Sequence, residues 1–168
     1  DHIDTDLKKL MSARHSDILD GLSHIRADKM NPPQGSLLSR ALELLQFPDA
    51  DIREEAVAAL ALHWQCKEAF PVLLEMLRGG ESDQVVLEIA ARAVSVYAGQ
   101  DMYEKNIALA ALAEIALNFK YDPELRGIAY LSALRIAERI TDTDWAGSEE
   151  DIEKLDVDWE WLKKLITI

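Results

Sequence analysis

The sequence predicts an all-helical fold: a short α-solenoid of about three helical hairpins with a capping helix at each end. Two observations support this prediction. Apolar residues recur at spacings of three and four along most of the 168 residues, which is the spacing of one helix face. A short pattern that begins with aspartate also recurs three times, at separations of 34 and 39 residues, as in helical solenoids. We expect a single domain over residues 1–168.

The N-terminal part predicts one long helix over residues 3–27. Its apolar stripe consists of Leu7, Met11, Ile18, Leu22 and Ile25. The segment 31–35 contains two prolines and a glycine, which cannot continue a helix, so a corner is expected there. Ser36 is the expected N-cap of the next helix, which stops near Pro48.

The middle of the chain predicts five more helices, over residues 50–65, 67–78, 83–98, 101–119 and 123–140. Glycine, aspartate and proline lie where these periodic segments stop and start. The expected stops and caps of the later helices are Gly99, Asp101, Asp122 and Pro123.

The C-terminal part predicts a polar loop over residues 141–147 and a last helix over residues 148–168. Ser148 and Asp151 have the spacing of a capping box at the start of this helix. Its apolar stripe consists of Ile152, Leu155, Trp159, Leu162 and Ile166. Trp159 is therefore expected in the core. Trp161 falls about 200° around the helix from it and is expected to be exposed.

The three copies of the repeated pattern align without gaps over residues 49–56, 83–90 and 122–129. Each copy begins with aspartate, has an aliphatic residue at its fourth position and has alanine at its eighth. One face of each helix is therefore lined by aliphatic or small residues. The positions on these faces are 52, 56, 59 and 60, then 86, 90, 93 and 94, then 125, 129 and 133.

This unit resembles the repeat of the HEAT family, including the short HEAT-like repeats of bacterial proteins. The resemblance covers residues 36–141 as three repeats. It implies an α-solenoid whose ends need polar caps, which would be an N-terminal capping helix at residues 1–30 and an acidic C-terminal capping helix at residues 148–168.

The resemblance also implies roles for particular residues. Aspartate and arginine near the turn would tie adjacent repeats together. The matching pairs are Asp49 with Arg53 and Asp122 with Arg126, and Leu87 interrupts the pattern in the middle copy. In HEAT proteins the second helices commonly line a concave side that binds partners. Carried over to this chain, the partner-binding positions are Glu54, Glu55, Ala58, Glu88, Arg92, Gly127 and Leu131.

The strongest compositional feature is a net charge of −13, which opposes the binding of nucleic acid or of an anionic membrane surface. A basic protein is the complementary partner. The longest nearly apolar run, residues 107–117, is shorter than the ~20 residues of a membrane span. The single cysteine, Cys66, excludes an internal disulfide and is expected to be an inert, half-buried thiol, which is compatible with a cytoplasmic location.

The charge is concentrated in residues 142–160, called the acidic segment below, which contain nine acidic residues and one lysine. Tryptophans lie among these charges, and exposed tryptophan is enriched at binding hot spots. The partner-binding candidates in this part of the chain are Glu149, Glu150, Asp156, Asp158 and Trp161. A solvated capping helix without a partner is the alternative interpretation.

No pattern in the sequence indicates a catalytic centre or a cofactor. A metal site on the first helix is rejected, because one helix carries all its candidate ligands: His15, Asp17, Asp20 and His24. We therefore expect a non-catalytic protein–protein interaction module. Its sharper form is an acidic immunity or antitoxin-type inhibitor that neutralises a basic toxin. The alternatives are a HEAT-like phycobilin lyase or isomerase and a structural adaptor subunit.

Overall fold

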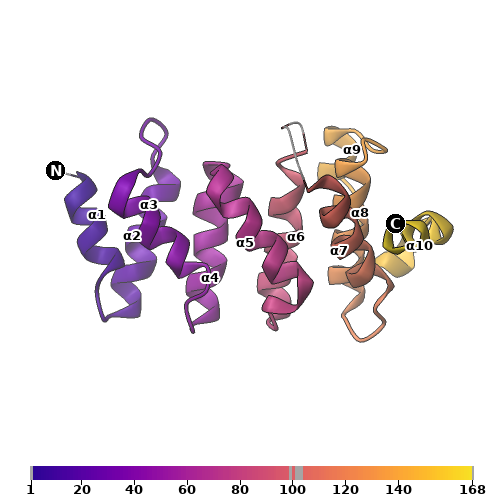
Figure 1. Cartoon of the computed structure of the whole chain (residues 1–168), viewed down its shortest axis with the longest axis horizontal. Helices are drawn as coiled ribbons and strands as arrows, with labels where there is room; N and C mark the ends of the chain where they lie inside the picture. Colours follow the sequence, from indigo (N-terminus) through magenta and orange to yellow (C-terminus); the bar gives the residue numbers. More distant parts are fainter. Residues whose placement is uncertain (1, 99, 101–103, 168) are drawn as a thin grey trace. The chain divides into compact units, whose positions relative to one another are not determined.

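The computed structural model describes residues 2–98, 100 and 104–167. This part of the chain is helical and contains no strand, so the all-helical prediction is confirmed (Figure 1). The helices form two compact units, Asp1–Val72 and Leu73–Ile168, and the division falls within helix α5. None of the helices in the described residues combines the length and the apolar composition required of a membrane span.

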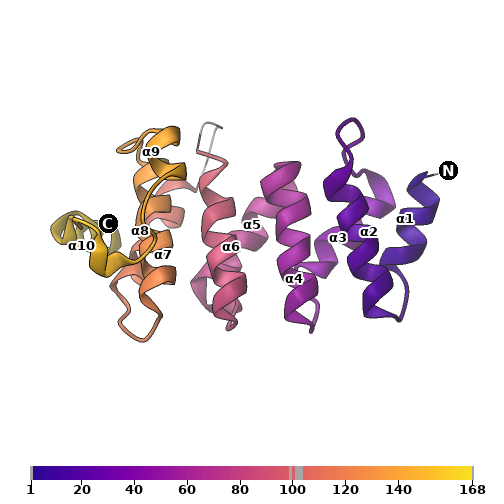
Figure 2. The ribbon, with the colours of Figure 1, turned by 180° about the vertical axis from the view of Figure 1, so that it is seen from behind.

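The first unit contains α1 (His2–Leu10), α2 (His15–Ala27), α3 (Gly35–Leu44) and α4 (Ala50–Val57), followed by a π-helical segment (Ala58–His63) and a 3-10 turn (Lys67–Ala69). Helices α1 and α2 lie side by side in both views (Figures 1 and 2). The α2 helix also packs against α4. The largest fully buried side chains here are Leu10, Ile18, Leu22, Leu44, Leu45, Ile52 and Leu60.

The single N-terminal helix predicted over residues 3–27 is wrong, because the chain reverses after Leu10 and forms two helices. At the break, the Ser12 hydroxyl donates to Asp17 and accepts from the backbone N–H of Arg14, which competes with helical hydrogen bonds. The reversal packs Leu10 against α2 at Gly21, where an added Cβ would lie 2.9 Å from Leu10 Cδ2. Met11, predicted on the apolar stripe, is 62% exposed.

The aspartates of the repeated pattern occupy the N-cap position of α4, α6 and α8. The Asp49 carboxylate accepts from the backbone N–H groups of Asp51 and Ile52, and Asp83 accepts from Val86. Asp122 makes no side-chain cap bond, but Pro123 occupies the first turn. The predicted cap at Ser36 is wrong, because α3 begins at Gly35 with Gln34 in the cap position. Gly99 and Asp101 lie outside the described residues.

The second unit contains most of α5 (Phe70–Glu75), a π-helical segment (Met76–Gly80), α6 (Gln84–Ser95), α7 (Lys105–Leu117), α8 (Pro123–Ile136), α9 (Asp142–Ala146), a 3-10 turn (Ile152–Lys154) and α10 (Trp159–Ile166). Helix α8 packs against both α6 and α7, and α10 packs against α7 (Figure 2). The 3-10 turn also packs against α8. The acidic segment therefore returns to the helices that precede it.

The predicted apolar faces of the three repeated helices are buried, at most 1% exposed at every position. The alanine at the eighth position, Ala56, Ala90 or Ala129, is 0% exposed in each copy. Two arginines of the repeated pattern bind backbone carbonyls that precede their own helix. Arg53 donates to the carbonyls of Phe47 and Pro48, and Arg126 donates to that of Ala116. At the equivalent position, Leu87 is buried.

The last helix predicted over residues 148–168 is wrong in its first half. The Ser148 hydroxyl donates to the carbonyl of Asp144 and starts no helix. Asp151 instead caps the 3-10 turn Ile152–Lys154, after which the chain is extended as far as α10. The predicted loop at residues 141–147 contains α9, whose N-cap Thr141 accepts from the backbone N–H of Asp144.

Candidate partner-binding site

Three arginines of α6 and the end of α8 fasten the acidic segment to these helices. The pairs are Arg92–Glu150 at 2.6 Å, Arg135–Asp142 at 3.1 Å and Arg139–Asp158 at 3.2 Å. The Arg135 side chain is the least exposed of the three arginines, at 18%. Two of the predicted partner-binding residues, Glu150 and Asp158, are therefore directed at arginines of the same chain.

Aromatic side chains strengthen the same contact. The guanidinium of Arg135 lies over the Trp145 ring, 4.2 Å from its centroid, and that of Arg139 lies over Trp161 at 4.5 Å. Tyr130 meets Trp161 edge to face, and its hydroxyl accepts from the backbone N–H of Asp158. The predicted exposure of Trp161 is therefore wrong, since this ring is half-buried.

Trp159, predicted in the core, is 38% exposed. Because the helix does not start at Ser148, the stripe drawn through Ile152 and Leu155 does not continue into α10. Asp158 is the true N-cap of α10, and its carboxylate accepts from the backbone N–H of Trp161. That hydrogen bond and the guanidinium of Arg139 lower the pKa of the Asp158 carboxyl below its ordinary value.

Four other carboxylates of the acidic segment face solvent. Asp144, Glu149, Glu153 and Asp156 are exposed, and within the described residues none of them forms an ion pair. The exposed acidic surface includes two of the predicted partner-binding residues, Glu149 and Asp156. Glu150 and Asp158, also predicted, bind arginines of the same chain.

A pocket of about 230 Å³ lies beneath α9. The residues that line this α9 pocket are Arg92, Ile128, Leu131, Trp145, Ala146, Ser148 and Glu150. It brings together three residues predicted separately from the sequence: Arg92 on α6, Leu131 on α8 and Glu150 in the acidic segment. Leu131 is only 5% exposed, because the acidic segment covers the face of α8 that was expected to be open.

Burial and nearby charges shift the pKa of Glu88, which lies one turn before Arg92 on α6. Burial raises the pKa of its carboxyl above the ordinary value. Arg92 lowers this pKa, whereas the charges of Glu150, Glu124 and Asp122 raise it further. Negative charge is therefore in excess around the start of α6 and α8.

The partner-binding residues predicted in the first unit are Glu54, Glu55 and Ala58, and only one of them is available to a partner. Glu55 pairs with Arg26 at 3.2 Å and accepts from Ser23, so its carboxylate is used within the unit. Ala58 is 6% exposed, and the prediction that it lies on an open surface is wrong. Glu54 is partly exposed. Only Glu54 in this set has a side chain that is both accessible and without an ion pair in the described part of the chain.

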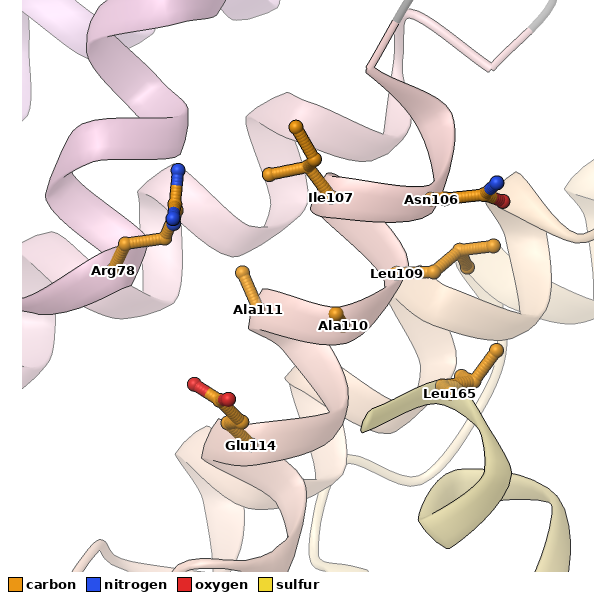
Figure 3. A pocket seen from close by; sticks show the side chains of 8 residues that line it. All are labelled: Arg78, Asn106, Ile107, Leu109, Ala110, Ala111, Glu114 and Leu165. Carbon is orange, nitrogen blue, oxygen red and sulfur yellow. The ribbon is translucent and has the colours of Figure 1, made fainter. Parts of the chain in front are cut away.

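Figure 3 shows another pocket of the second unit, of about 210 Å³. It lies along α7, with Arg78 and Glu114 to one side and Leu165 of α10 to the other. Ala110 and Ala111 of α7 also line it. None of the residues predicted from the sequence as a site lies in this pocket.

The polar residues of the first helices form a local network. Lys9 of α1 binds Asp20 of α2, and His24 lies 3.3 Å from Asp6. His15 lies 3.1 Å from Asp49. Across the described residues, no group of three or more potential metal-binding side chains is found. These contacts join α1 to α2 and α2 to the start of α4.

The sequence did not predict several contacts of the site. Arg135 and Arg139 lie one turn apart on the last turn of α8 and just beyond it, and that spacing was their only signal. The sequence predicted that Trp145 lies in a loop, and it indicated no role for Tyr130. Their roles depend on contacts with distant residues: Tyr130 contacts Asp158 and Trp161, which lie 28 and 31 positions away.

Comparisons of the chain with protein-family models, with curated proteins and with solved structures found no match.

Proposed function

We propose that this chain is a non-catalytic binding module that holds a cationic segment of another protein against its acidic segment. The observation that carries the proposal is a group of exposed carboxylates that form no ion pair with any described residue: Asp144, Glu149, Glu153 and Asp156. They lie on a chain of net charge −13, which attracts cationic partners and accelerates their encounter.

The three arginine pairs support this proposal because they hold the acidic segment in place before a partner arrives. A pre-ordered segment loses less conformational entropy on binding than a free one. Ile152 anchors its second half and is 2% exposed, and Leu162 of α10, just beyond the segment, is 0% exposed. Glu153 and Asp156, which lie between these two buried residues, are therefore held in place before a partner arrives.

The proposed scaffold is a short HEAT-like solenoid. Its support is the threefold pattern with a buried alanine at the same place in each copy. Arg53 and Arg126 add support, because both donate to backbone carbonyls that precede their own helix. A sharper form of the functional proposal is an immunity or antitoxin-type inhibitor. It predicts that a basic toxin loses its activity in the complex; a partner that stays active would indicate an adaptor.

The test of the binding function is a titration of the full chain with a fluorescent hexa-arginine peptide, followed by anisotropy. We expect binding at about 20 mM salt and its loss at about 500 mM, because salt screens exposed charges. The variant D144N/E153Q/D156N should bind at least about fivefold more weakly. Its control, E68Q/E75Q/E114Q, removes the same charge from exposed carboxylates outside the segment.

Equal weakening by the two triple variants would show that net charge alone governs binding. No binding of the peptide to the wild-type chain at low salt would reject the proposed function.

A further inference from the structure

The α9 pocket is covered by an element that is held without buried side chains. Helix α9 buries no residue, and Trp145 is half-exposed. Its attachments are the Arg135–Asp142 pair at its first residue, the Arg92–Glu150 pair after it and the stacking of Arg135 on Trp145. Polar and stacking contacts of this kind break and re-form at small cost compared with an apolar core.

The lining of the pocket combines an apolar floor with an opposite pair of charges. Ile128 and Leu131 of α8 are 3% and 5% exposed and form apolar surface. The one cation among the lining residues is Arg92, whose Nη2 lies 2.6 Å from Glu150 Oε1. Both side chains of this pair are accessible, at 33% and 47%. The chain therefore shows an arginine bound to Glu150 at the edge of an open cavity.

The charge around the pocket favours a second cation. Glu88 lies on α6 one turn from Arg92, and its carboxyl responds to the negative charges of Glu150, Glu124 and Asp122. Among the residues that line the α9 pocket, Arg92 supplies the one guanidinium near this group of carboxylates. An incoming positive side chain would meet attraction at the pocket even while Arg92 remains nearby.

We infer that the α9 pocket receives an arginine side chain of the cationic partner, whose guanidinium replaces that of Arg92 at Glu150. This inference rests on the proposed function and names the anchor of the partner. The aliphatic stem of the incoming arginine lies on Ile128 and Leu131, and its planar head lies at Glu150, because Arg135 already covers the Trp145 ring. Arg92, displaced from Glu150, turns toward Glu88, four residues earlier on the same helix.

Arginine suits this pocket better than lysine. Its planar guanidinium binds a carboxylate through two parallel hydrogen bonds and stacks on aromatic rings, whereas the lysine ammonium is a compact, strongly hydrated charge. The chain already makes both interactions with its own arginines, at Glu150 and over the Trp145 ring. A hexa-arginine peptide should therefore bind several-fold more tightly than a hexa-lysine peptide of equal charge.

The test uses the full chain, the fluorescent hexa-arginine peptide and two pairs of charge-matched variants. E150Q removes the carboxylate of the pocket, and its control E149Q removes the neighbouring exposed carboxylate, which does not line the pocket. R92Q removes the internal competitor, and its control R78Q removes an exposed arginine elsewhere in the second unit. Thermal unfolding of all four variants verifies that each one is folded.

We expect E150Q to weaken binding about three- to fivefold more than E149Q does, and R92Q to tighten binding about threefold more than R78Q does. The opposite signs follow because Glu150 would hold the partner while Arg92 competes with it. If each variant matches its control while the wild-type chain binds the peptide, the pocket inference is rejected and the binding function stands. If the wild-type chain does not bind the peptide, both are rejected.

Discussion

The backbone of Glu150 lies directly against Gly127 of α8. A Cβ added at Gly127 would lie 1.6 Å from the carbonyl oxygen of Glu150, 2.6 Å from its carbonyl carbon and 3.0 Å from the backbone nitrogen of Ile152. No side-chain rotation relieves this overlap, because the opposing atoms belong to the backbone. The contact fixes where the acidic segment crosses α8, and it places the Glu150 side chain within reach of Arg92.

Replacement of Gly127 by alanine should detach the acidic segment from α8 at this point. Alanine favours a helix interior over glycine by about 1 kcal/mol, yet we expect a net loss of about 1–3 kcal/mol in the free energy of unfolding, because backbone must move. Chemical denaturation measures the loss, and hydrogen exchange should accelerate over residues 148–153. Gly147→Ala is the control, since its Cβ would meet nothing closer than 3.6 Å. Equal stability of the two variants would contradict the close crossing.

Asp158 should make the attachment of α10 sensitive to acid. The backbone N–H of Trp161 and the Arg139 guanidinium lower the pKa of this carboxyl, so the charged form stabilises the folded state. That contribution is present above the ordinary carboxyl pKa and is lost as the pH falls through the lowered value.

We therefore expect Asp158→Asn to melt at a lower temperature than the wild-type chain at neutral pH, and the difference to vanish in acid. Thermal scans over a pH series measure it. Asp156→Asn is the control, because Asp156 forms no ion pair in the described part of the chain. A pH-independent difference for Asp158→Asn would show that its charge is not responsible.

Glu88 should have the opposite effect on stability. Burial raises the pKa of its carboxyl, so the charged form is less favourable in the folded chain than in the unfolded one. Stability from this group therefore increases as the pH falls from neutral through the raised pKa toward the ordinary carboxyl value. Glu88→Gln should raise the melting temperature by about 1–2 °C at neutral pH, and the gain should disappear in acid.

Glu54→Gln is the matched control for this substitution, since Glu54 occupies the same place in the first copy of the repeated pattern. A melting temperature lowered by Glu88→Gln at neutral pH would mean that its attraction to Arg92 outweighs burial.

Cys66 should be unreactive in the folded chain. Burial, with a smaller effect from the charge of Glu68, raises the pKa of its thiol to about 11. At a pH of about 8.5, half of an ordinary thiol is ionised, but only about three Cys66 thiols per thousand are. Alkylation by iodoacetamide should thus be at least about tenfold slower in the native chain than in urea. Equal rates, followed by mass spectrometry, would contradict this.

Local features of the sequence determined the helices of the middle of the chain. The burial of Ile52, Ala56, Val86 and Ala90 followed from their spacing, because residues three or four apart share one face of a helix wherever that helix packs. The caps at Asp49 and Asp83 were likewise predictable, since a cap bonds backbone only two or three residues away. Periodicity and capping act within a few residues, so one sequence suffices to find them.

Only the tertiary structure decided how the ends of the chain are used. The reversal after Leu10 depends on packing against Gly21, and the crossing of α8 depends on the room left at Gly127. The Arg92–Glu150 pair joins residues 58 positions apart, and no local pattern relates them. The acidic segment had the composition of a free binding surface. Its attachment to arginines of the same chain followed from geometry, because the pairing of charges depends on distance in space and not on spacing along the sequence.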